Sequence, residues 1–324
     1  MTVAAVSAII LTVDISQVIR ALERVPPVVL GLVVALLAAD RVLMGFKWRH
    51  LVNGAGGHMR IRDAVAIYFQ SGFAALLLPT SVGGEVLRGV LGQRAGVPLQ
   101  LLLASMVTEK LVAGLSNAAL AVAGALYIVS VADDHHATVG LLVAGSTLIV
   151  AGAVVLAGNR RAHQRIGRLL RRWVPQRGFR LMDQSSASVV DYWRRKTLLR
   201  TNLLLNIVEH LLQFAALYLL ARGLGIDFGL LPFLAVTAVV MLVRRTVGFL
   251  ESWWLAESAV VVLYTLFGVP EALSVALAFT LWAASIVATL PGAVQLYRMG
   301  LTVGEWRPSS AVRAAGERGR SRTF

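Results

Sequence analysis

The chain has no cysteine and few charged residues, and both absences narrow the kinds of protein it can be. Without cysteine it can form no disulfide, no covalent haem attachment and no thiolate metal site. Asp, Glu, Lys and Arg make up 15% of its 324 residues, against about 25% in a typical soluble domain. The sequence also lacks the ten-residue alternating segments of an outer-membrane barrel. The composition therefore disfavours a soluble domain, and the pattern excludes a membrane β-barrel.

Long apolar runs make up much of the sequence instead and indicate a polytopic membrane protein. Hydrophobic residues account for 57% of the chain, and the mean hydropathy is +0.72. A spanning helix needs about 20 apolar residues. Runs of this kind cover 28–46, 98–131, 137–157, 202–221 and 270–296. We predict an all-α membrane fold of about six spanning helices plus two broken or re-entrant helical hairpins.

The net charge of +14 lies mostly between and after the apolar runs. Residues 160–200 carry twelve Lys and Arg against two Asp, and the tail from residue 298 carries six Arg against two Glu. Basic loops of membrane proteins stay in the cytoplasm. We therefore expect a multi-pass protein of the cell (inner) membrane with a cytoplasmic C-terminus. No nucleic-acid-binding motif accompanies the charge, so no nucleic-acid partner is expected.

These features divide the chain into three parts. Residues 1–25 are predicted to be an apolar or interfacial N-terminal segment, 26–300 a membrane domain, and 301–324 a basic cytoplasmic tail that is disordered. Within the membrane domain, the basic segment 159–200 separates a first half, 26–158, from a second half, 201–300. The turn at 133–136 holds two Asp and two His. We interpret it as an external, solvated loop and not as a metal site, because nothing fixes a ligand geometry.

A break in one apolar stretch marks the candidate site. Pro79, Gly83 and Gly84 stand where a helix should continue, and Glu85 and Arg88 follow at once. Irregular backbone at membrane depth survives only where protein covers it or it lines a water-filled cavity. An ionisable residue there indicates a functional site. We predict that the chain is non-helical from the proline to the second glycine, that it forms a re-entrant hairpin, and that Arg88 is the local partner of Glu85.

A second interrupted element lies between two short apolar arms, at 230–243 and 258–267. The intervening residues include four charged ones, namely Arg244, Arg245, Glu251 and Glu257. The two interrupted elements share a spacing. Glu85 is followed by Gly-Val-Pro ending at Pro98, and Glu257 is followed at the same offsets by Gly-Val-Pro ending at Pro270. With the basic segments inside, the two hairpins enter from opposite sides of the membrane, which predicts an inverted repeat.

Polar residues also occur within the apolar spans. Glu109 and Lys110 interrupt the run 98–131. In the run 202–221, four polar residues have i, i+3, i+4 and i+7 spacing and share one helical face, namely Asn206, Glu209, His210 and Gln213. A polar stripe on a membrane helix faces the interior of the bundle. Asp40 and Arg41 are expected to pair or to snorkel, whereas Lys47 and Trp48 are expected at the membrane interface.

The motifs around the first break resemble those of a known family. The family's P-[GT]-S-[IV]-G-G-[DE]-x-x-R is matched from Pro79 to Arg88, its S-x-x-x-[DE]-[RK] at 105–110, and its E-x10-G-x-P from Glu257 to Pro270. On these residues the chain resembles the lysylphosphatidylglycerol synthase transmembrane-region family, a flippase-like membrane domain, over residues 28–300. Among stand-alone members, the LPTSVGGEV wording is most similar to hopanoid-associated membrane proteins.

Two features depart from the family pattern. The family usually shows P-G-x-x-G shortly before the second acid, whereas residues 249–256 read FLESWWLA. The basic residue usual in the last span is also missing, since Leu281 and Trp282 stand near its place. No aminoacyl-transferase domain is expected to follow in a chain of this length, so lipid lysylation is not an expected activity.

The resemblance implies a protein that translocates or exports a lipid, with a phospholipid or a hopanoid as cargo. Arg88 would bind a phosphate, and a surplus of acids would be balanced by a proton or a cationic headgroup. The predicted binding and translocation residues are Ser81, Gly83, Gly84, Glu85, Arg88, Glu109, Lys110, Glu209, Arg244, Glu251 and Glu257. The predicted structural breaks are Pro79, Gly83, Gly84, Pro98 and Pro270.

Two other functions stay open at this point. One is an accessory membrane protein that scaffolds a lipid- or glycan-synthesis enzyme, its buried charges merely pairing with one another. The other is an enzyme, which we do not expect because the sequence holds no HExxH, nucleophile elbow or P-loop. Membrane lipids are therefore the expected partners, and no cofactor or metal is implied.

Overall fold

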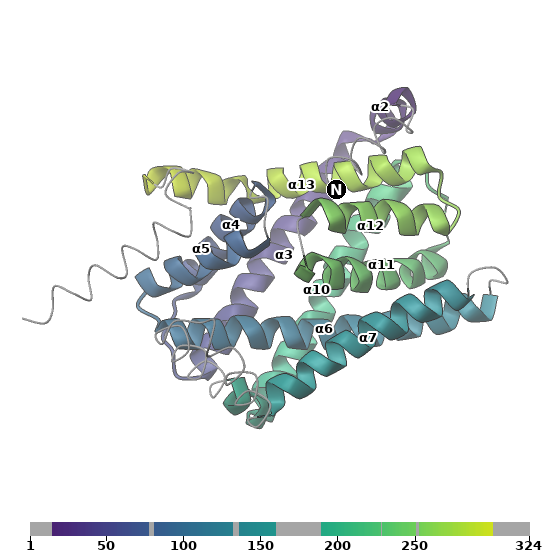
Figure 1. The fold of residues 1–324 in the computed structure, drawn as a ribbon. Coiled ribbons are helices and arrows are strands. Elements are labelled where there is room, and N and C mark those ends of the chain that lie inside the picture. The colour runs from purple at the N-terminus through teal and green to yellow at the C-terminus, as the bar shows by residue number, and fades with distance from the viewer. Residues whose placement is uncertain are drawn as a thin grey trace, which may run out of the picture.

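The computed structural model describes residues 15–77, 81–131, 136–159, 189–227, 229–250 and 253–300. This part of the chain is helical, with turns and short connections and no strand (Figure 1). The labelled helices are α2 (Ile15–Arg24), α3 (Pro27–Gly54), α4 (Ile61–Leu77), α5 (Ser81–Arg94), α6 (Leu99–Val131), α7 (His136–Gly158), α10 (Lys196–Gly223), α11 (Leu230–Leu250), α12 (Trp253–Leu266) and α13 (Glu271–Arg298). The prediction of an all-α fold is confirmed.

Four of the described helices are long and apolar enough to cross a membrane. They are Pro27–Gly54, Leu99–Ser130, Lys196–Gly223 and Glu271–Arg298. Helix α7 holds a shorter apolar stretch, Gly140–Leu156. A helix rises 1.5 Å per residue, so the spans exceed the roughly 30 Å hydrocarbon thickness of a bilayer. The chain is therefore an integral, multi-pass membrane protein.

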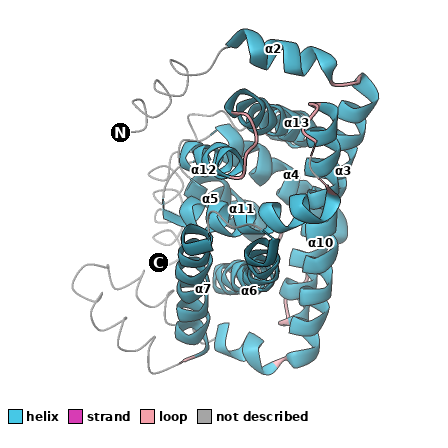
Figure 2. Cartoon of the chain, turned by 90° about the vertical axis from the view of Figure 1, so that its right-hand side faces the viewer, coloured by secondary structure: helices cyan, strands magenta, loops and turns pink. Residues whose placement is uncertain are grey.

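Two helix directions build the molecule. Helices α13, α12, α11 and α6 stack on one another in Figure 1, and Figure 2 views them nearly end-on. Helices α3 and α10 pack along each other and run across this stack. Helix α4, which forms a hairpin with α5, packs against α13, while α11 packs against α6. Apolar side chains from these helices form the main core, with Leu220, Phe233 and Leu277 among its fully buried members.

Helix α3 is longer than predicted, and this overturns the interfacial assignment of two residues. The predicted span ends at residue 46, but the helix continues to Gly54. Lys47 and Trp48 are both 0% exposed and lie in the interior. The prediction failed because a Lys-Trp-Arg cluster is typical of a membrane boundary. Here the lysine instead forms an ion pair with Glu209 on the neighbouring helix α10.

The short helical segment at 189–194 ties the second half of the chain to the end of α3. The Tyr192 hydroxyl donates a 3.1 Å hydrogen bond to the Leu51 carbonyl, and Arg195 donates to the Gly54 carbonyl. Burial raises the pKa of Tyr192, so the phenol stays protonated and keeps its donor role. Two of the last carbonyls of α3 are thereby satisfied.

The first break is shorter than predicted. Helix α5 begins at Ser81, so Gly83 and Gly84 are helical, and the expectation of a non-helical chain up to Gly84 is wrong. Pro79 lies outside the described residues. Gly84 is required for packing and not for backbone freedom. A Cβ added to Gly84 would lie 2.7 Å from the Ser71 carbonyl oxygen on α4.

The second break is also narrower than predicted. Helix α11 continues through Arg244 and Arg245 to Leu250, and α12 begins at Trp253. The predicted interruption from 244 to 257 is therefore wrong at both ends. An interruption was predicted there because adjacent arginines are unusual inside an apolar helix. Glu251 lies outside the described residues.

The two Gly-Val-Pro sequences form the same turn. Gly96 and Gly268 both have φ of +87°, a left-handed conformation that favours glycine. The Val97 amide donates to the Gly92 carbonyl, and the Val269 amide donates to the Tyr264 carbonyl. This six-to-one bond is the signature of a Schellman C-cap. In each case a long helix then begins directly after the proline.

Candidate functional site

Two adjoining cavities lie among the polar residues of the helices. The first has a volume of about 430 Å³ and the second about 450 Å³. Both are lined by Arg41 and Met44 from α3, Gly72 and Ala75 from α4, and Arg245 from α11. These shared residues mark where the cavities join, so the two form one continuous space that charged side chains line among apolar helices.

The first cavity contains a buried cluster around Arg88. The Arg88 guanidinium lies 2.9 Å from Glu109 Oε2 and also donates to the Tyr68 hydroxyl. Tyr68 in turn donates a 2.6 Å hydrogen bond to Glu109 Oε1. The guanidinium carbon lies 5.3 Å from the ring centre of Trp48 and 4.9 Å from that of Tyr68. The two rings pack edge to face, with their centres 5.8 Å apart, so Arg88 makes cation–π contacts with both, and its charge is neutralised by one carboxylate.

Arg88 is therefore not the partner of Glu85, and that prediction is wrong. Glu85 forms its ion pair with Lys110 on α6, and these side chains are 36% and 33% exposed. On α5, Glu85 pairs with Lys110 of α6. Arg88, on the same helix, pairs with Glu109 of α6. One-turn spacing made Arg88 the nearest partner along the sequence, but α6 offers a better-placed opposite charge to each.

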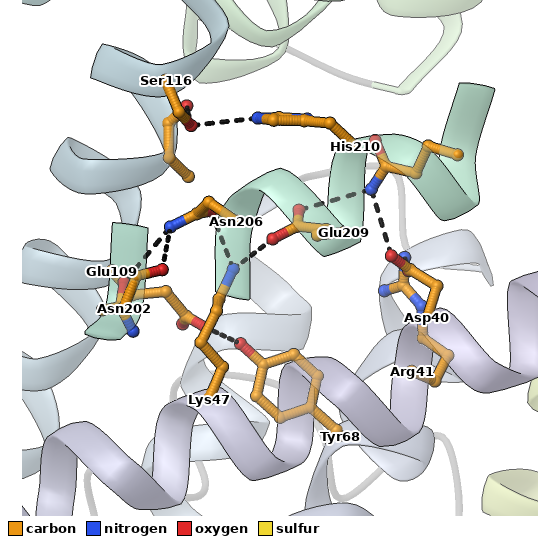
Figure 3. A network of polar contacts seen from close by, with 12 residues as sticks. Asp40, Arg41, Lys47, Tyr68, Glu109, Ser116, Asn202, Asn206, Glu209 and His210 are labelled. Atoms are coloured by element: carbon orange, nitrogen blue, oxygen red, sulfur yellow. Dashed lines mark hydrogen bonds and ion pairs between the residues drawn. The ribbon is translucent and has the colours of Figure 1, made fainter. Parts of the chain in front are cut away.

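A second buried network links α3 to α10 (Figure 3). The Lys47 ammonium forms an ion pair with Glu209 and donates a 2.9 Å hydrogen bond to Asn206 Oδ1. Asn206 donates to the carbonyl oxygen of Asn202 at 2.9 Å. Lys47 and Glu209 are both 0% exposed as residues. A buried ion pair of this kind survives only because each charge has a close partner.

The same carboxylate extends the network to the second cavity. Gln213 donates 3.3 Å hydrogen bonds to Glu209 Oε1 and to Asp40 Oδ1. Arg41 pairs with Asp40 at 2.9 Å, as expected, and Arg245 lies 3.4 Å from Glu209. The polar stripe of α10 thus faces the interior, as predicted. His210, also on this stripe, contacts Ser116 Oγ at 2.9 Å.

The structure brings most of the predicted site residues together. The predicted residues that line the first cavity are Gly84, Glu85, Arg88, Glu109 and Lys110. Those that line the second cavity include Glu209 and Arg244. Gly83 is half-buried on α5, and Pro98 and Pro270 precede α6 and α13. The side chains of Ser81 and Glu257 and the whole of Pro79 and Glu251 lie outside the described residues.

Four functional candidates were missed by sequence reasoning. Tyr68 and Asn202 belong to the two networks, while Arg41 and Arg245 line both cavities. Asn202 stands four residues before Asn206 and extends the polar stripe, so its spacing was a usable signal. Tyr68 carried no such signal, because a tyrosine in an apolar helix usually packs in the core.

Opposite charges line the cavities in pairs that range from buried to about one-third exposed. Among the described residues, no three His, Asp or Glu side chains gather as a metal site would require. The guanidinium groups and carboxylates instead offer charge-assisted hydrogen bonds to a polar ligand.

Comparison with known proteins identifies the domain. The family model described as the lysylphosphatidylglycerol synthase TM region matches residues 1–292. The chain belongs to this family. A search of curated proteins finds no match. Lysylphosphatidylglycerol synthase TM regions are membrane domains, and this agrees with the four apolar helices and indicates a lipid-related function.

Proposed function

We propose that this protein translocates a lipid between the two leaflets of a membrane. The observation that supports this best is the joined polar cavity, which lies among α3, α4, α5, α6, α10, α11 and α13. Charges inside a membrane bundle are costly and are retained where they serve a pathway. A lipid headgroup would occupy the cavity while its acyl chains remain in the bilayer. The cargo in this proposal is a phospholipid or a hopanoid.

An inverted repeat is part of the proposal. Helices α3, α4, α5 and α6 would correspond to α10, α11, α12 and α13. The matched turns at Gly96 and Gly268 support this, and so does the packing of α4 on α13 and of α11 on α6. In this arrangement α4–α5 and α11–α12 are re-entrant hairpins that meet at the shared cavity from opposite leaflets.

The proposed orientation can be tested by labelling. We expect the connection between α3 and α4 to be cytoplasmic and that between α10 and α11 to be external, in a cell-membrane protein. Asp227, whose side chain is 93% exposed, and the exposed Arg62 report on these two sides. In the natural cysteine-free background, an impermeant thiol reagent should label Asp227→Cys in intact cells, and Arg62→Cys only after permeabilisation. Strong labelling of Arg62→Cys in intact cells would reverse the proposed topology.

Filling the junction of the cavities should abolish translocation. A Cβ added to Gly72 would lie 3.6 Å from Thr289 Cγ2 and 3.7 Å from Arg41 Cδ, which is ordinary contact. Gly72→Ala should therefore fold and transport normally, whereas the ring of Gly72→Phe would occupy the cavity. The assay uses vesicles with a fluorescent lipid and an impermeant quencher. We expect Gly72→Phe to reduce translocation to the level of protein-free vesicles.

The matched control is Gly152→Phe. Gly152 is exposed on α7, and a Cβ there meets nothing within 4 Å, so this variant should transport like the wild type. If the wild-type protein moves no lipid above the rate of empty vesicles, translocation is refuted and the accessory function gains support. If Gly72→Phe is folded and fully active, the cavity is not the route.

A further inference from the structure

We propose that the cavity selects a lipid whose headgroup carries a phosphate and no amine, with Arg41 and Arg245 as the phosphate ligands. This rests on the proposed function, because it names the class of lipid that the same cavity would accept. The inference comes from the pairing of the charges, from the exposure of the two arginines, and from their position at the junction of the cavities.

Every described acid that lines the cavities already has a basic partner. Glu85 pairs with Lys110 and Glu109 with Arg88. Asp40 pairs with Arg41, while Glu209 meets two bases, Lys47 and Arg245. A headgroup ammonium entering this space would find each described carboxylate of the lining already paired with a cation. An aminoacylated or amine-bearing headgroup would therefore be repelled at close range or would have to displace an existing pair.

Among the described residues, the same pairing leaves one base in excess. Glu209 contacts two bases, Lys47 and Arg245, so these described acids are outnumbered by the bases that contact them. The negative surplus expected from the sequence counted Glu85 and Glu257 against Arg88 alone, without the bases supplied by α3, α6 and α11. The side chain of Glu257 lies outside the described residues, so that surplus stays a prediction.

Arg41 and Arg245 are the bases best placed to meet a ligand. Their side chains are 32% and 27% exposed, whereas those of Lys47 and Arg88 are 0% and 8% exposed. Lys110 is 33% exposed but lines only the first cavity. Both arginines line both cavities, one from α3 and the other from α11. Arg88, which the sequence suggested as the phosphate ligand, is instead enclosed by Glu109 and two aromatic rings.

The contacts of these two arginines leave room for a phosphate. Arg41 contacts Asp40 through Nη2 at 2.9 Å, and Arg245 contacts Glu209 through Nη2 at 3.4 Å, a long distance for a strong bond. A guanidinium has five N–H donors in a fork that matches phosphate oxygens. Arg41 and Arg245 line the same cavities from α3 and α11, so the two groups can bind one phosphodiester together while the carboxylates keep each arginine oriented.

Lipid binding measured apart from transport tests this inference. The full-length protein in detergent would be examined by native mass spectrometry with phosphatidylglycerol, phosphatidylethanolamine and lysylphosphatidylglycerol in equal amounts. We expect phosphatidylglycerol to be retained preferentially. Arg41→Gln and Arg245→Gln should each weaken its retention about tenfold, as expected for one charge-assisted hydrogen bond. Arg245→Lys, which keeps the charge, should restore part of it.

The control variant is Arg222→Gln, which removes an arginine that pairs with exposed Asp227 outside the cavities. It should retain phosphatidylglycerol like the wild type. A separate arm of the experiment adds glycerol 3-phosphate as a competitor. If it competes as well as the lipid does, the site binds a free phosphate compound and the lipid assignment is overturned. Equal retention of the three lipids, or folded Arg41→Gln and Arg245→Gln proteins with unchanged retention, would also overturn the inference.

Because binding and translocation are measured separately, failure of the proposed function can be distinguished from failure of the ligand assignment. Preferential binding without translocation would refute the proposed function and leave the ligand class supported. Translocation without any preference among the three lipids would support the proposed function and overturn the assigned ligand class.

Discussion

Gly292→Ala is expected to destabilise the folded protein by about 3 kcal/mol, a large effect for one methyl group. Gly292 lies where α13 crosses α4. A Cβ there would stand 2.3 Å from both the carbonyl carbon and the carbonyl oxygen of Phe69. These are backbone atoms of a helix and cannot rotate away, so the two helices must separate. Gly124→Ala should behave alike, since its Cβ would lie 2.5 Å from the Ala235 carbonyl oxygen where α6 crosses α11.

Unfolding of the purified variants in detergent, followed against temperature or denaturant, measures this effect. The control is Gly145→Ala on α7, where an added Cβ meets nothing within 4 Å. That variant should be neutral or slightly stabilised, because alanine favours a helix over glycine. Wild-type stability in Gly292→Ala would show that the crossing is looser than the structure indicates.

Breaking the buried pair between Lys47 and Glu209 should cost about 3 kcal/mol or more for either single substitution. Glu209→Gln leaves the Lys47 ammonium in the interior with only amide oxygens as partners. Lys47→Met leaves the Glu209 carboxylate with Arg245 at 3.4 Å as its remaining base. The double variant Lys47→Met/Glu209→Gln removes both charges and should cost less than the sum of the single variants.

Unfolding of the three variants gives this coupling directly. A matched control is Glu85→Gln, which breaks another Glu–Lys pair between helices. Its side chains are about one-third exposed, so its cost should stay within about 1 kcal/mol. Additive costs in the Lys47 and Glu209 cycle would mean that the two charges do not depend on each other.

The sequence predicted those features of the fold that depend on local physical chemistry. The apolar runs predicted the spans, because the length and hydropathy that a bilayer requires are properties of each helix by itself. The polar spacing from Asn206 to Gln213 gave the inward face of α10 in the same way. Pro98 and Pro270, which were predicted as structural breaks, directly precede α6 and α13, because a proline can begin a helix but cannot continue one.

The partners of the charges could not be predicted in this way. Arg88 and Glu85 are neighbours on one helix, but their partners come from α6, which approaches through tertiary packing. Lys47 looked interfacial because its acid lies 162 residues away along the chain. The cavity-lining role of Arg245 likewise depends on α11 continuing past residue 243, which an apolar run alone does not indicate.

The crossing of α4 with α13 also bears on how the protein is made. Gln70 donates a 2.9 Å hydrogen bond to Gln295, and 225 residues separate them in the chain. When α4 leaves the ribosome, the helix that will cover it does not yet exist. Until α13 has been made, the surface of α4 that contacts Gly292 has no partner from that helix. The packing of the first half is therefore completed only after synthesis has reached α13.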